Sequence, residues 1–348
     1  MNLLNIEDIS IKLNNKDILS KINFSLKAGE VLSIIGPSGS GKSSILRVIA
    51  GLLRPNQGKI IYNNKIISSK KKIIPTGKRN IGLMFQEDVL FPHLTVYQNV
   101  EFGLNNLLRK NKELLVNNYL KEFGIYEKKN DYPNLLSGGE KQRVALARIL
   151  ITKPKILLMD EPFSNLDNNL RKDICDFTLN TLKKNKISVI FVTHDIEEAL
   201  RVSDNVMVIK SGKIIQKDTP QELYSNPKSK YVAKLLGLVN QFEVKADRSG
   251  KVLTPFGKVN CIKCLKESFN CKEKKHFCII RPDSLIIGNK GIKGKIVEKY
   301  FLGSSWSYKV KLNETNQLFN VANCKKELNL KQLVKIYFDM KNILIFQE

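Results

Sequence analysis

The first residues whose types and spacing could do chemistry form a glycine-rich loop that contains one lysine. The loop lies between an apolar stretch at residues 30–35 and an apolar, helix-like stretch opened by Ser44, and it consists of Gly36, Pro37, Ser38, Gly39, Ser40, Gly41, Lys42 and Ser43. Glycines at this spacing let main-chain N–H groups close around a phosphate, and the following helix adds the positive end of its dipole. Lys42 would neutralise β- and γ-phosphate oxygens, and the Ser43 hydroxyl would ligate Mg2+. This strand–loop–helix pattern predicts binding of a nucleoside triphosphate.

Two more apolar strands end in polar side chains. Residues 155–159 lead into Asp160 and Glu161, and residues 188–193 lead into His194. Apolar strands of this kind belong in the middle of a parallel sheet, and the carboxyl ends of such strands meet at the edge where ligands bind. Asp160 would hold the Mg2+ water shell, Glu161 would polarise an attacking water, and His194 would contact the γ-phosphate.

A second helix start carries glycines but no lysine of its own. It reads Leu136, Ser137, Gly138, Gly139 and Glu140, and a strongly helical stretch follows at residues 144–150. Ser137 is a good N-cap, and the two glycines expose main-chain N–H groups. By itself, this segment predicts only a capped helix.

Taken together, these motifs resemble the ATPase subunit of an ABC transporter, from Ile6 to about Leu236. They occur in the order of that family: the Walker A loop at residues 36–43, the Q-loop residue Gln86, the signature at residues 136–140, Walker B with Asp160 and Glu161, the D-loop Ser164-Asn165-Leu166-Asp167, and the switch residue His194. The resemblance implies an α/β fold. Residues 1–236 would form a P-loop ABC ATPase domain with a mixed central sheet and a helical subdomain at about 87–153, and residues 237–348 would follow as an all-β, OB-like barrel.

The resemblance also implies a mechanism with ATP and Mg2+ as cofactors. Two copies would pack head to tail, so that the signature residues Ser137, Gly138, Gly139 and Glu140 of one copy face the nucleotide of the other. The D-loop residue Asp167 would also bind nucleotide. Glu161 would act as the base and His194 would position the γ-phosphate. Gln86 would contact Mg2+ and the water, and would couple closure to a membrane partner.

One departure from the family concerns the adenine base. The family commonly stacks adenine on an aromatic residue shortly before the Walker A strand, but that place here is Leu13, between Lys12 and Asn14. Adenine would therefore pack on aliphatic surface, with weaker or less base-selective binding.

The composition excludes a wholly disordered chain and a collagen-like or mucin-like chain, and its most conspicuous feature is the net charge. Hydrophobic residues make up 42%, which is enough for ordinary cores, and the formal net charge is +25. The excess divides into 37 basic and 23 acidic residues up to position 236, and 21 basic and 10 acidic residues after it, with 48 Lys against 10 Arg. Because the excess is dispersed and skewed towards Lys, we interpret it as the bias of an AT-rich coding sequence and expect no specific nucleic-acid partner.

The sequence predicts a peripheral membrane location. No apolar run approaches the roughly 18 residues that a membrane span needs, and the acidic N-terminus does not have the pattern of a signal peptide. One cassette without a span of its own needs a separate integral-membrane permease. We therefore expect the protein at the cytoplasmic face of the inner membrane.

The last 112 residues favour import. They contain strand-like segments that suggest a small β-barrel, at residues 251–254, 277–280, 307–312, 333–338 and 343–346. The stretches Ile280-Arg281-Pro282-Asp283 and Phe301-Leu302-Gly303-Ser304 resemble the TOBE-type regulatory domain of importer ATPases. The resemblance implies a role in dimerisation and regulation, and an extracytoplasmic solute-binding protein as an indirect partner.

The best indication of the substrate is the stretch at residues 86–96. Importer ATPases for ferric iron, polyamines, sulfate, molybdate, thiamine and sugars all resemble it, and its form, with residues 66–79 ahead of it, is most similar to the ferric-iron group. His93 then belongs to the surface that faces the channel. Our hypothesis is import of Fe(3+), with the other solutes as alternatives.

Four late cysteines leave a metal site open. Cys261, Cys264, Cys271 and Cys278 could supply thiolates to zinc or to an iron–sulfur cluster, although their spacing matches no standard pattern. Cys278 opens an apolar stretch, where a thiol packs as a small hydrophobic group.

Two rival functions remain in other classes. One is a soluble ABC ATPase that acts on nucleic acid or ribosomes, which the charge would favour. The other is a regulatory module that binds ATP without hydrolysing it, although Glu161 and His194 are both in place.

Overall fold

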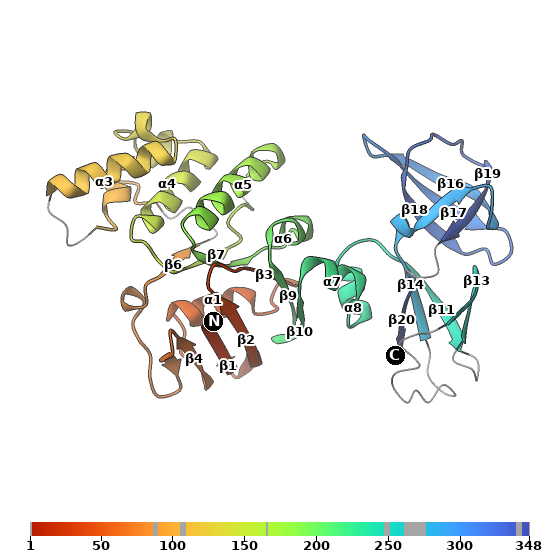
Figure 1. The fold of residues 1–348 in the computed structure, drawn as a ribbon, viewed down its shortest axis with the longest axis horizontal. Helices are drawn as coiled ribbons and strands as arrows, with labels where there is room; N and C mark the ends of the chain where they lie inside the picture. The colour runs from red at the N-terminus through yellow and green to blue at the C-terminus, as the bar shows by residue number, and fades with distance from the viewer. Residues whose placement is uncertain are drawn as a thin grey trace. The chain divides into compact units, whose positions relative to one another are not determined.

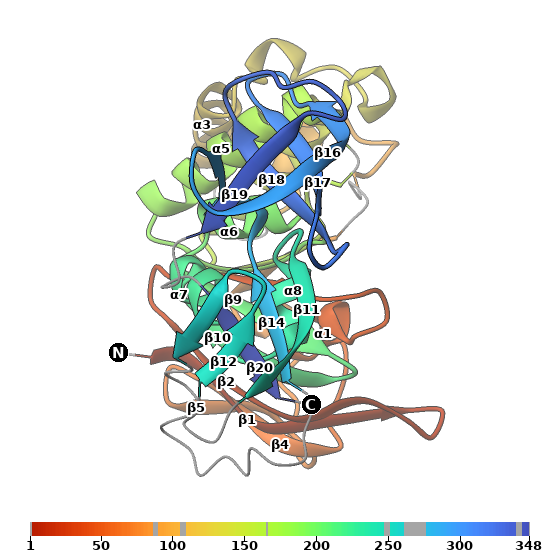
Figure 2. The same ribbon diagram turned by 90° about the vertical axis from the view of Figure 1, so that its right-hand side faces the viewer.

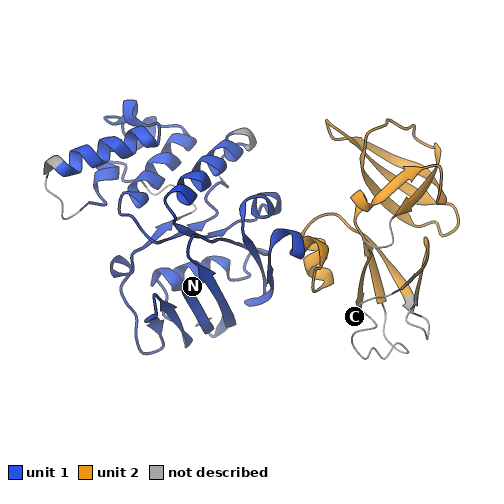
Figure 3. Cartoon of the chain, viewed as in Figure 1, with its two compact units in different colours: residues 1–223 blue, residues 224–348 orange. Residues whose placement is uncertain are grey.

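A computed structural model describes residues 2–85, 90–104, 109–164, 166–246, 251–260, 276–338 and 343–347. The chain forms two compact units, residues 1–223 and 224–348 (Figure 3), and each is described by itself. Among the helices of these residues, none combines the length and the apolar character that crossing a bilayer requires.

The first unit is built on a six-stranded sheet in the order β10-β9-β3-β8-β7-β6. All neighbours from β9 to β6 are parallel, and β10 pairs antiparallel with β9. Every residue of β3 and β8 is buried, as expected for central strands with both faces covered. The strands are β3 (Val31–Ile35), β6 (Ile81–Met84), β7 (Ile156–Asp160), β8 (Ser188–Val192), β9 (Asn205–Lys210) and β10 (Lys213–Asp218).

Alternate side chains of the central strands enter two different cores. Leu157 and Phe191 pack with apolar residues of the helices α4 and α5 on one face of the sheet. Leu158 and Ile190 pack on the other face with α1 and with a second sheet, so that α3, α4 and α5 lie opposite α1 (Figure 1). The helices are α1 (Lys42–Ala50), α2 (Val96–Glu101), α3 (Arg109–Glu122), α4 (Gly138–Leu150), α5 (Asn168–Lys184), α6 (Ile196–Val202) and α7 (Pro220–Ser225), with 3-10 turns η1 (Thr76–Lys78), η2 (Tyr126–Lys128) and η3 (Pro133–Leu135).

The second sheet of this unit is antiparallel and has the order β2-β1-β4-β5. Its long strands alternate between buried and exposed residues, which is the pattern of a sheet with one covered face. The strands are β1 (Asn2–Leu13), β2 (Lys16–Lys27), β4 (Gln57–Tyr62) and β5 (Lys65–Ser69).

The second unit begins with the end of α7 and the helix α8 (Lys230–Leu235). Buried Arg281 donates to the carbonyl oxygen of Ala233 at 2.8 Å and to that of Tyr224 at 3.4 Å. These bonds attach residues 224–236 to the strands that follow.

The strands of the second unit form two five-stranded antiparallel sheets, in the orders β13-β12-β11-β14-β20 and β15-β19-β16-β17-β18 (Figure 2). Apolar residues of both sheets share one core, which confirms the predicted all-β C-terminal region. The elements are β11 (Asn240–Ala246), β12 (Lys251–Thr254), β13 (Gly257–Asn260), β14 (His276–Ile280), η4 (Pro282–Ser284), β15 (Leu285–Gly288), β16 (Ile292–Phe301), β17 (Trp306–Leu312), β18 (Leu318–Cys324), β19 (Leu333–Phe338) and β20 (Leu344–Gln347).

Of the four cysteines considered for a metal site, only Cys278 lies within the described residues. Its thiol is fully buried in the core of the second unit, and burial raises the pKa of Cys278 to about 12. In the described part of the chain, no group of three or more His, Cys, Asp and Glu side chains could hold a metal ion. Cys261, Cys264 and Cys271 lie outside the described residues, so a metal site there stays a prediction.

Candidate functional site

The glycine-rich loop connects the buried strand β3 to α1, as the sequence predicts. Gly41 ends the loop as the N-cap of α1, with φ +98°. A Cβ atom at this position would lie 2.6 Å from Leu19 Cδ2 and 2.9 Å from the carbonyl oxygen of Ile18, both on β2. The position therefore needs glycine for its backbone conformation and for the close approach of β2. Pro37, Ser38, Gly39 and Ser40 complete the loop, and Ser44 is the third residue of α1.

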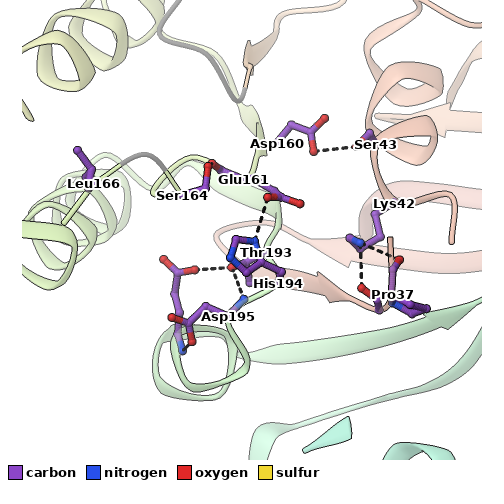
Figure 4. A network of polar contacts seen from close by, with 12 residues as sticks. Pro37, Lys42, Ser43, Asp160, Glu161, Ser164, Leu166, Thr193, His194 and Asp195 are labelled. Carbon is purple, nitrogen blue, oxygen red and sulfur yellow. Dashed lines mark hydrogen bonds and ion pairs between the residues drawn. The ribbon is translucent and has the colours of Figure 1, made fainter. Parts of the chain in front are cut away.

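Lys42 is the first residue of α1, and its side chain turns back to the loop. Its Nζ donates to the carbonyl oxygen of Gly36 at 2.9 Å and to that of Pro37 at 3.0 Å (Figure 4). Burial lowers the pKa of Lys42, and the charges of Glu161 and Asp160 act in the opposite direction. The sequence thus places a buried cation beside two carboxylates.

Ser43 and Asp160 meet across the sheet edge. Ser43 Oγ donates to Asp160 Oδ1 at 3.0 Å, which joins the first turn of α1 to the end of β7. Burial raises the pKa of Asp160, while the Ser43 hydrogen bond lowers it. A hydroxyl and a carboxylate are the hard oxygen donors that Mg2+ prefers, so this pair fits the metal that the sequence predicts.

Glu161 follows β7 in a backbone conformation that is unusual for a residue with a side chain, with φ +47°. Neighbouring segments hold it there. Its N–H donates to the carbonyl oxygen of Val192 at 2.9 Å, and its carbonyl oxygen accepts from Ser164 N at 3.2 Å and Ser164 Oγ at 3.0 Å. Strain of this kind costs about 1–3 kcal/mol and is typical of functional sites.

The fixed backbone directs the Glu161 carboxylate towards His194. The distance from His194 Nδ1 to Glu161 Oε2 is 2.9 Å (Figure 4). The His194 side chain is 60% exposed and that of Glu161 is 23% exposed, so the pair faces solvent at the ends of β7 and β8. The structure therefore brings together Lys42, Ser43, Asp160, Glu161 and His194 at one sheet edge.

The second glycine-bearing helix start has the N-cap that the sequence predicts. Ser137 caps α4 in a reciprocal box, because Ser137 N donates to Glu140 Oε2 at 2.8 Å and Ser137 Oγ accepts from Glu140 N at 3.4 Å. The hydrogen bond from Ser137 N holds the pKa of Glu140 below its usual range. Asp167 caps α5 in a similar way, accepting from Leu170 N at 2.9 Å.

Gly138 and Gly139 lie where α4 passes α5. A Cβ atom on Gly139 would approach Ile174 Cδ1 to 2.7 Å, whereas one on Gly138 would lie 3.4 Å from Leu166 Cδ2. Within the described residues, no hydrogen bond or ion pair joins residues 137–140 to the loop at 36–43 of the same chain.

Gln86 lies outside the described residues, so its role stays a prediction. Leu13, the predicted adenine neighbour, ends β1 and is 44% exposed, beside a turn made by Asn14 and Asn15.

Comparisons with known proteins identify the family of this chain. The sequence profile of the ABC transporter family matches residues 19–164. The chain is 43% identical over 237 residues to an Fe(3+) ions import ATP-binding protein of Haemophilus influenzae, and the match covers 68% of each protein. It is 34% identical over 349 residues to a spermidine/putrescine import ATP-binding protein of Mycoplasma capricolum subsp. capricolum, covering 98% of this chain and 97% of that protein. The chain belongs to the ABC transporter family.

The fold of this ABC transporter protein has a counterpart among solved structures. The structure of cbiO1 from Clostridium perfringens, part of the ABC transporter complex cbiONQ, shares 35% sequence identity and has a TM-score of 0.59. The match covers 65% of this chain and 91% of that one. The likeness confirms the predicted P-loop ABC ATPase fold.

Sequence reasoning missed several buried polar residues of this ABC protein. Arg79 donates five hydrogen bonds, to the carbonyl oxygens of Ile74, Val48, Ile49 and Ile67 and to Ser68 Oγ. Two of these acceptors lie in the last turn of α1, where a cation also opposes the negative end of the helix dipole. No local pattern marks Arg79, but it is one of only 10 arginines beside 48 lysines.

Asn99 is a second missed residue. It is fully buried in α2, and its side chain bonds four main-chain atoms: it donates to the carbonyl oxygens of Phe91, Leu94 and Thr95 and accepts from Phe91 N. The segment around His93 is thereby fixed by one amide. A polar residue on the apolar face of a predicted helix is the signal that could have identified it.

Proposed function

We propose that this protein is the ATP-hydrolysing subunit of an ABC import complex, and that it drives uptake of a small solute through a separate membrane permease. The contact between Glu161 and His194, at the same sheet edge as Ser43 and Asp160, carries the proposal. A carboxylate and an imidazole within 2.9 Å of each other, beside a phosphate-binding loop, are the groups that hydrolysis of a phosphoanhydride needs.

Each residue has a role in this mechanism. Lys42 neutralises phosphate oxygens after exchanging its contacts with loop carbonyls for contacts with phosphate. Ser43 and Asp160, with Gln86, would hold Mg2+, which supplies charge neutralisation at the phosphates. Glu161 accepts the proton of the attacking water, and main-chain N–H groups of residues 36–43 bind the phosphate chain.

The position of the hydrogen on the imidazole ring of His194 determines whether this residue can donate a hydrogen bond to phosphate. An ionised Glu161 accepts a hydrogen bond from Nδ1, and a neutral imidazole with its hydrogen on Nδ1 then has only an acceptor at Nε2. Donation from Nε2 to a phosphate oxygen therefore requires either the imidazolium or release of Glu161. Either change links phosphate binding by His194 to the hydrogen bond that His194 makes with Glu161, the proposed base.

Two copies complete the site in the proposal. The start of α4, where Glu140 completes the capping box, offers the Ser137 hydroxyl and the N–H groups of two glycines to a phosphate, but lies apart from the loop of its own chain in the described contacts. A head-to-tail homodimer would bring this helix start, and Asp167 ahead of α5, to the nucleotide of the partner. The all-β second unit would serve dimerisation and regulation.

For the substrate we propose Fe(3+). The 43% identity to an iron importer protein over 237 residues and the form of residues 86–96 support this choice. The segment around His93, held by Asn99, would face the permease, and a solute-binding protein would deliver the ion outside. The protein would then lie at the cytoplasmic face of the inner membrane.

The hydrolytic role is tested with Glu161→Gln. The contacts of Ser164 go to the main chain of Glu161, so the turn is kept while the base is lost. We expect the rate of Mg-dependent phosphate release to fall about 10²- to 10⁴-fold, with ATP binding retained and a closed dimer trapped in size-exclusion chromatography. Near-normal turnover in this variant would remove Glu161 from its role.

The substrate is tested in vesicles that carry the complete complex. We expect ATPase stimulation by a binding protein loaded with ferric iron and none by one loaded with a polyamine. The reverse result would replace iron by polyamine, the solute named for the full-length Mycoplasma relative.

A further inference from the structure

In the described part of the first unit, the helices α2, α4 and α6 each have a polar N-cap residue and a Gln or Glu at the third helical position. The hydrogen bonds between these two positions differ in α6. In α2 and α4 the residue at the third helical position reaches back directly to the N–H of the cap: Gln98 Oε1 accepts from Thr95 N at 2.9 Å, and Glu140 Oε2 accepts from Ser137 N at 2.8 Å. These are ordinary capping boxes. In α6, Asp195 is the cap and Glu198 stands at the third position, but the Glu198 carboxylate does not accept directly from Asp195 N.

A threonine hydroxyl stands between the two partners in α6. Asp195 N donates to Thr193 Oγ1 at 3.0 Å (Figure 4). Thr193 Oγ1 in turn donates to Glu198 Oε2 at 2.6 Å. Asp195 Oδ1 still accepts from Glu198 N at 3.0 Å, so the cap itself is normal. The hydroxyl thus occupies the place where a direct bond would otherwise form.

The hydrogen bond between Thr193 and Asp195 joins the two residues that flank His194 in the sequence. Thr193 N also donates to the carbonyl oxygen of Ile34 in β3, at 3.3 Å. The main chain is therefore fixed on both sides of His194, while its imidazole is exposed and contacts Glu161 Oε2. An exposed side chain with little packing takes its direction from the main chain that carries it.

The relay formed by Thr193 and Glu198 is buried, in contrast to the exposed imidazole of His194. Thr193 is 4% exposed and Glu198 is 8% exposed, and burial raises the pKa of Glu198. Charged groups near this carboxyl include Asp195, Arg171 and Arg201, and its second oxygen is buried beside the Cys175 thiol. Burying a carboxylate costs stability, and a geometric requirement nearby is one reason for a protein to keep it.

We propose that Glu198 is a positioning residue for ATP hydrolysis, acting through the Thr193 hydroxyl to hold the imidazole of His194 against Glu161. This inference rests on the proposed ATPase function. It assigns no chemistry to Glu198, which touches neither His194 nor Glu161 in the described contacts.

Paired variants test the relay in the full-length protein. Glu198→Ala removes the acceptor and Thr193→Val removes the hydroxyl, whereas Glu198→Gln and Thr193→Ser keep a group that can make the bond. Because misplacement by about 1 Å can cost on the order of 10²-fold in rate, we expect kcat to fall about 10- to 100-fold in the first pair, with the KM for ATP unchanged. The second pair should keep kcat within about threefold.

A control separates positioning from loss of stability. Ser229→Ala removes the cap of α8, where Ser229 Oγ accepts from Val232 N, far from this relay in the sequence and in the other unit. It should lower stability by about 0.5–2 kcal/mol without changing kcat. If kcat in Glu198→Ala falls only in proportion to its folded fraction, the role is structural and the proposal fails.

A second readout does not depend on turnover. The chain has three histidines, so 15N-histidine labelling gives few imidazole signals, and His194→Ala assigns the relevant one. We expect the His194 signal to shift in Glu198→Ala and Thr193→Val but not in Glu198→Gln, Thr193→Ser or Ser229→Ala. Unchanged signals with parental kcat would overturn the proposal while leaving the ATPase function intact. The expected shifts in a protein that hydrolyses no ATP would overturn the ATPase function and leave the relay standing.

Discussion

Gln142 of α4 donates from Nε2 to the main-chain carbonyl oxygen of Pro162, 2.7 Å away, and the bond is buried. Pro162 directly follows Glu161, and Gln142 lies just over one turn beyond the capped start of α4. One hydrogen bond therefore ties the helix that would contact the nucleotide of a second copy to the residue after the proposed base. Movement of α4 would therefore shift Pro162 and, through it, the strained backbone of Glu161.

Gln142→Leu tests this link. Leucine has a similar size but cannot donate, so the Pro162 carbonyl loses its partner in a buried place. We expect a loss of about 1–3 kcal/mol in the free energy of unfolding, and a lower kcat with unchanged ATP affinity. Urea unfolding and nucleotide titration measure the two effects. Lys141→Leu on the same helix is the control and should change stability by less than about 0.5 kcal/mol; equal effects of the two variants would contradict the link.

Arg79→Lys should destabilise the first unit although it keeps the charge. Burial lowers the pKa of Arg79 to about 10, so the side chain is cationic at neutral pH. An ammonium group has three donor hydrogens and cannot replace the five bonds that the guanidinium makes. Losing two bonds from a charged group predicts a cost of about 3 kcal/mol, measured by denaturant unfolding. The neighbouring exposed residue gives the matched control, Lys78→Arg, which should be neutral.

The sequence predicted the parts of the site that depend on local patterns. Apolar runs located β3, β7 and β8, and because parallel strands end at one sheet edge, they also placed Asp160, Glu161 and His194 together. The N-cap Ser137 was predicted from a short-range rule. Segment bounds were less exact: α1 begins at Lys42, two residues before the predicted start, because Gly41 caps the helix in a left-handed conformation.

Contacts between residues far apart in the sequence could not be predicted in this way. The partners of Arg79 and Gln142 become neighbours only when β strands and helices from different parts of the chain pack together. The left-handed backbone of Glu161 likewise depends on contacts from β8 and Ser164. A capping-box pattern does mark Asp195 and Glu198, but it does not reveal the hydroxyl of Thr193 between them.

The two signature glycines should respond differently to a methyl group. Gly139→Ala would place Cβ 2.7 Å from Ile174 Cδ1 and 3.1 Å from Leu170 Cδ2, so these side-chain ends must shift within the packed space between α4 and α5, and we expect a loss of about 1 kcal/mol in stability. Gly138→Ala meets its nearest neighbour at 3.4 Å and should be neutral or slightly stabilising, because alanine favours the helix. Thermal or urea unfolding of the two variants checks the difference, and a larger loss for Gly138→Ala would contradict the packing described here.

The two capping boxes of the first unit should differ in their dependence on pH. Hydrogen bonds from Ser137 hold the pKa of Glu140 below its ordinary value of 4.5, so the folded state favours the ionised carboxylate. Its contribution to stability is therefore complete above pH 4.5 and is lost as the pH falls through the lower pKa of the folded state. We expect Glu140→Ala to cost about 1 kcal/mol at pH 7 and progressively less in acid.

The box of α2 provides the matched control for this prediction. Gln98 caps Thr95 with the same geometry but carries no charge, so the cost of Gln98→Ala should not change between pH 7 and acid. Urea unfolding of both variants over this range compares an ionisable box with a neutral one in the same fold. If the cost of Glu140→Ala stays constant as the pH falls, charge does not contribute to the cap of α4.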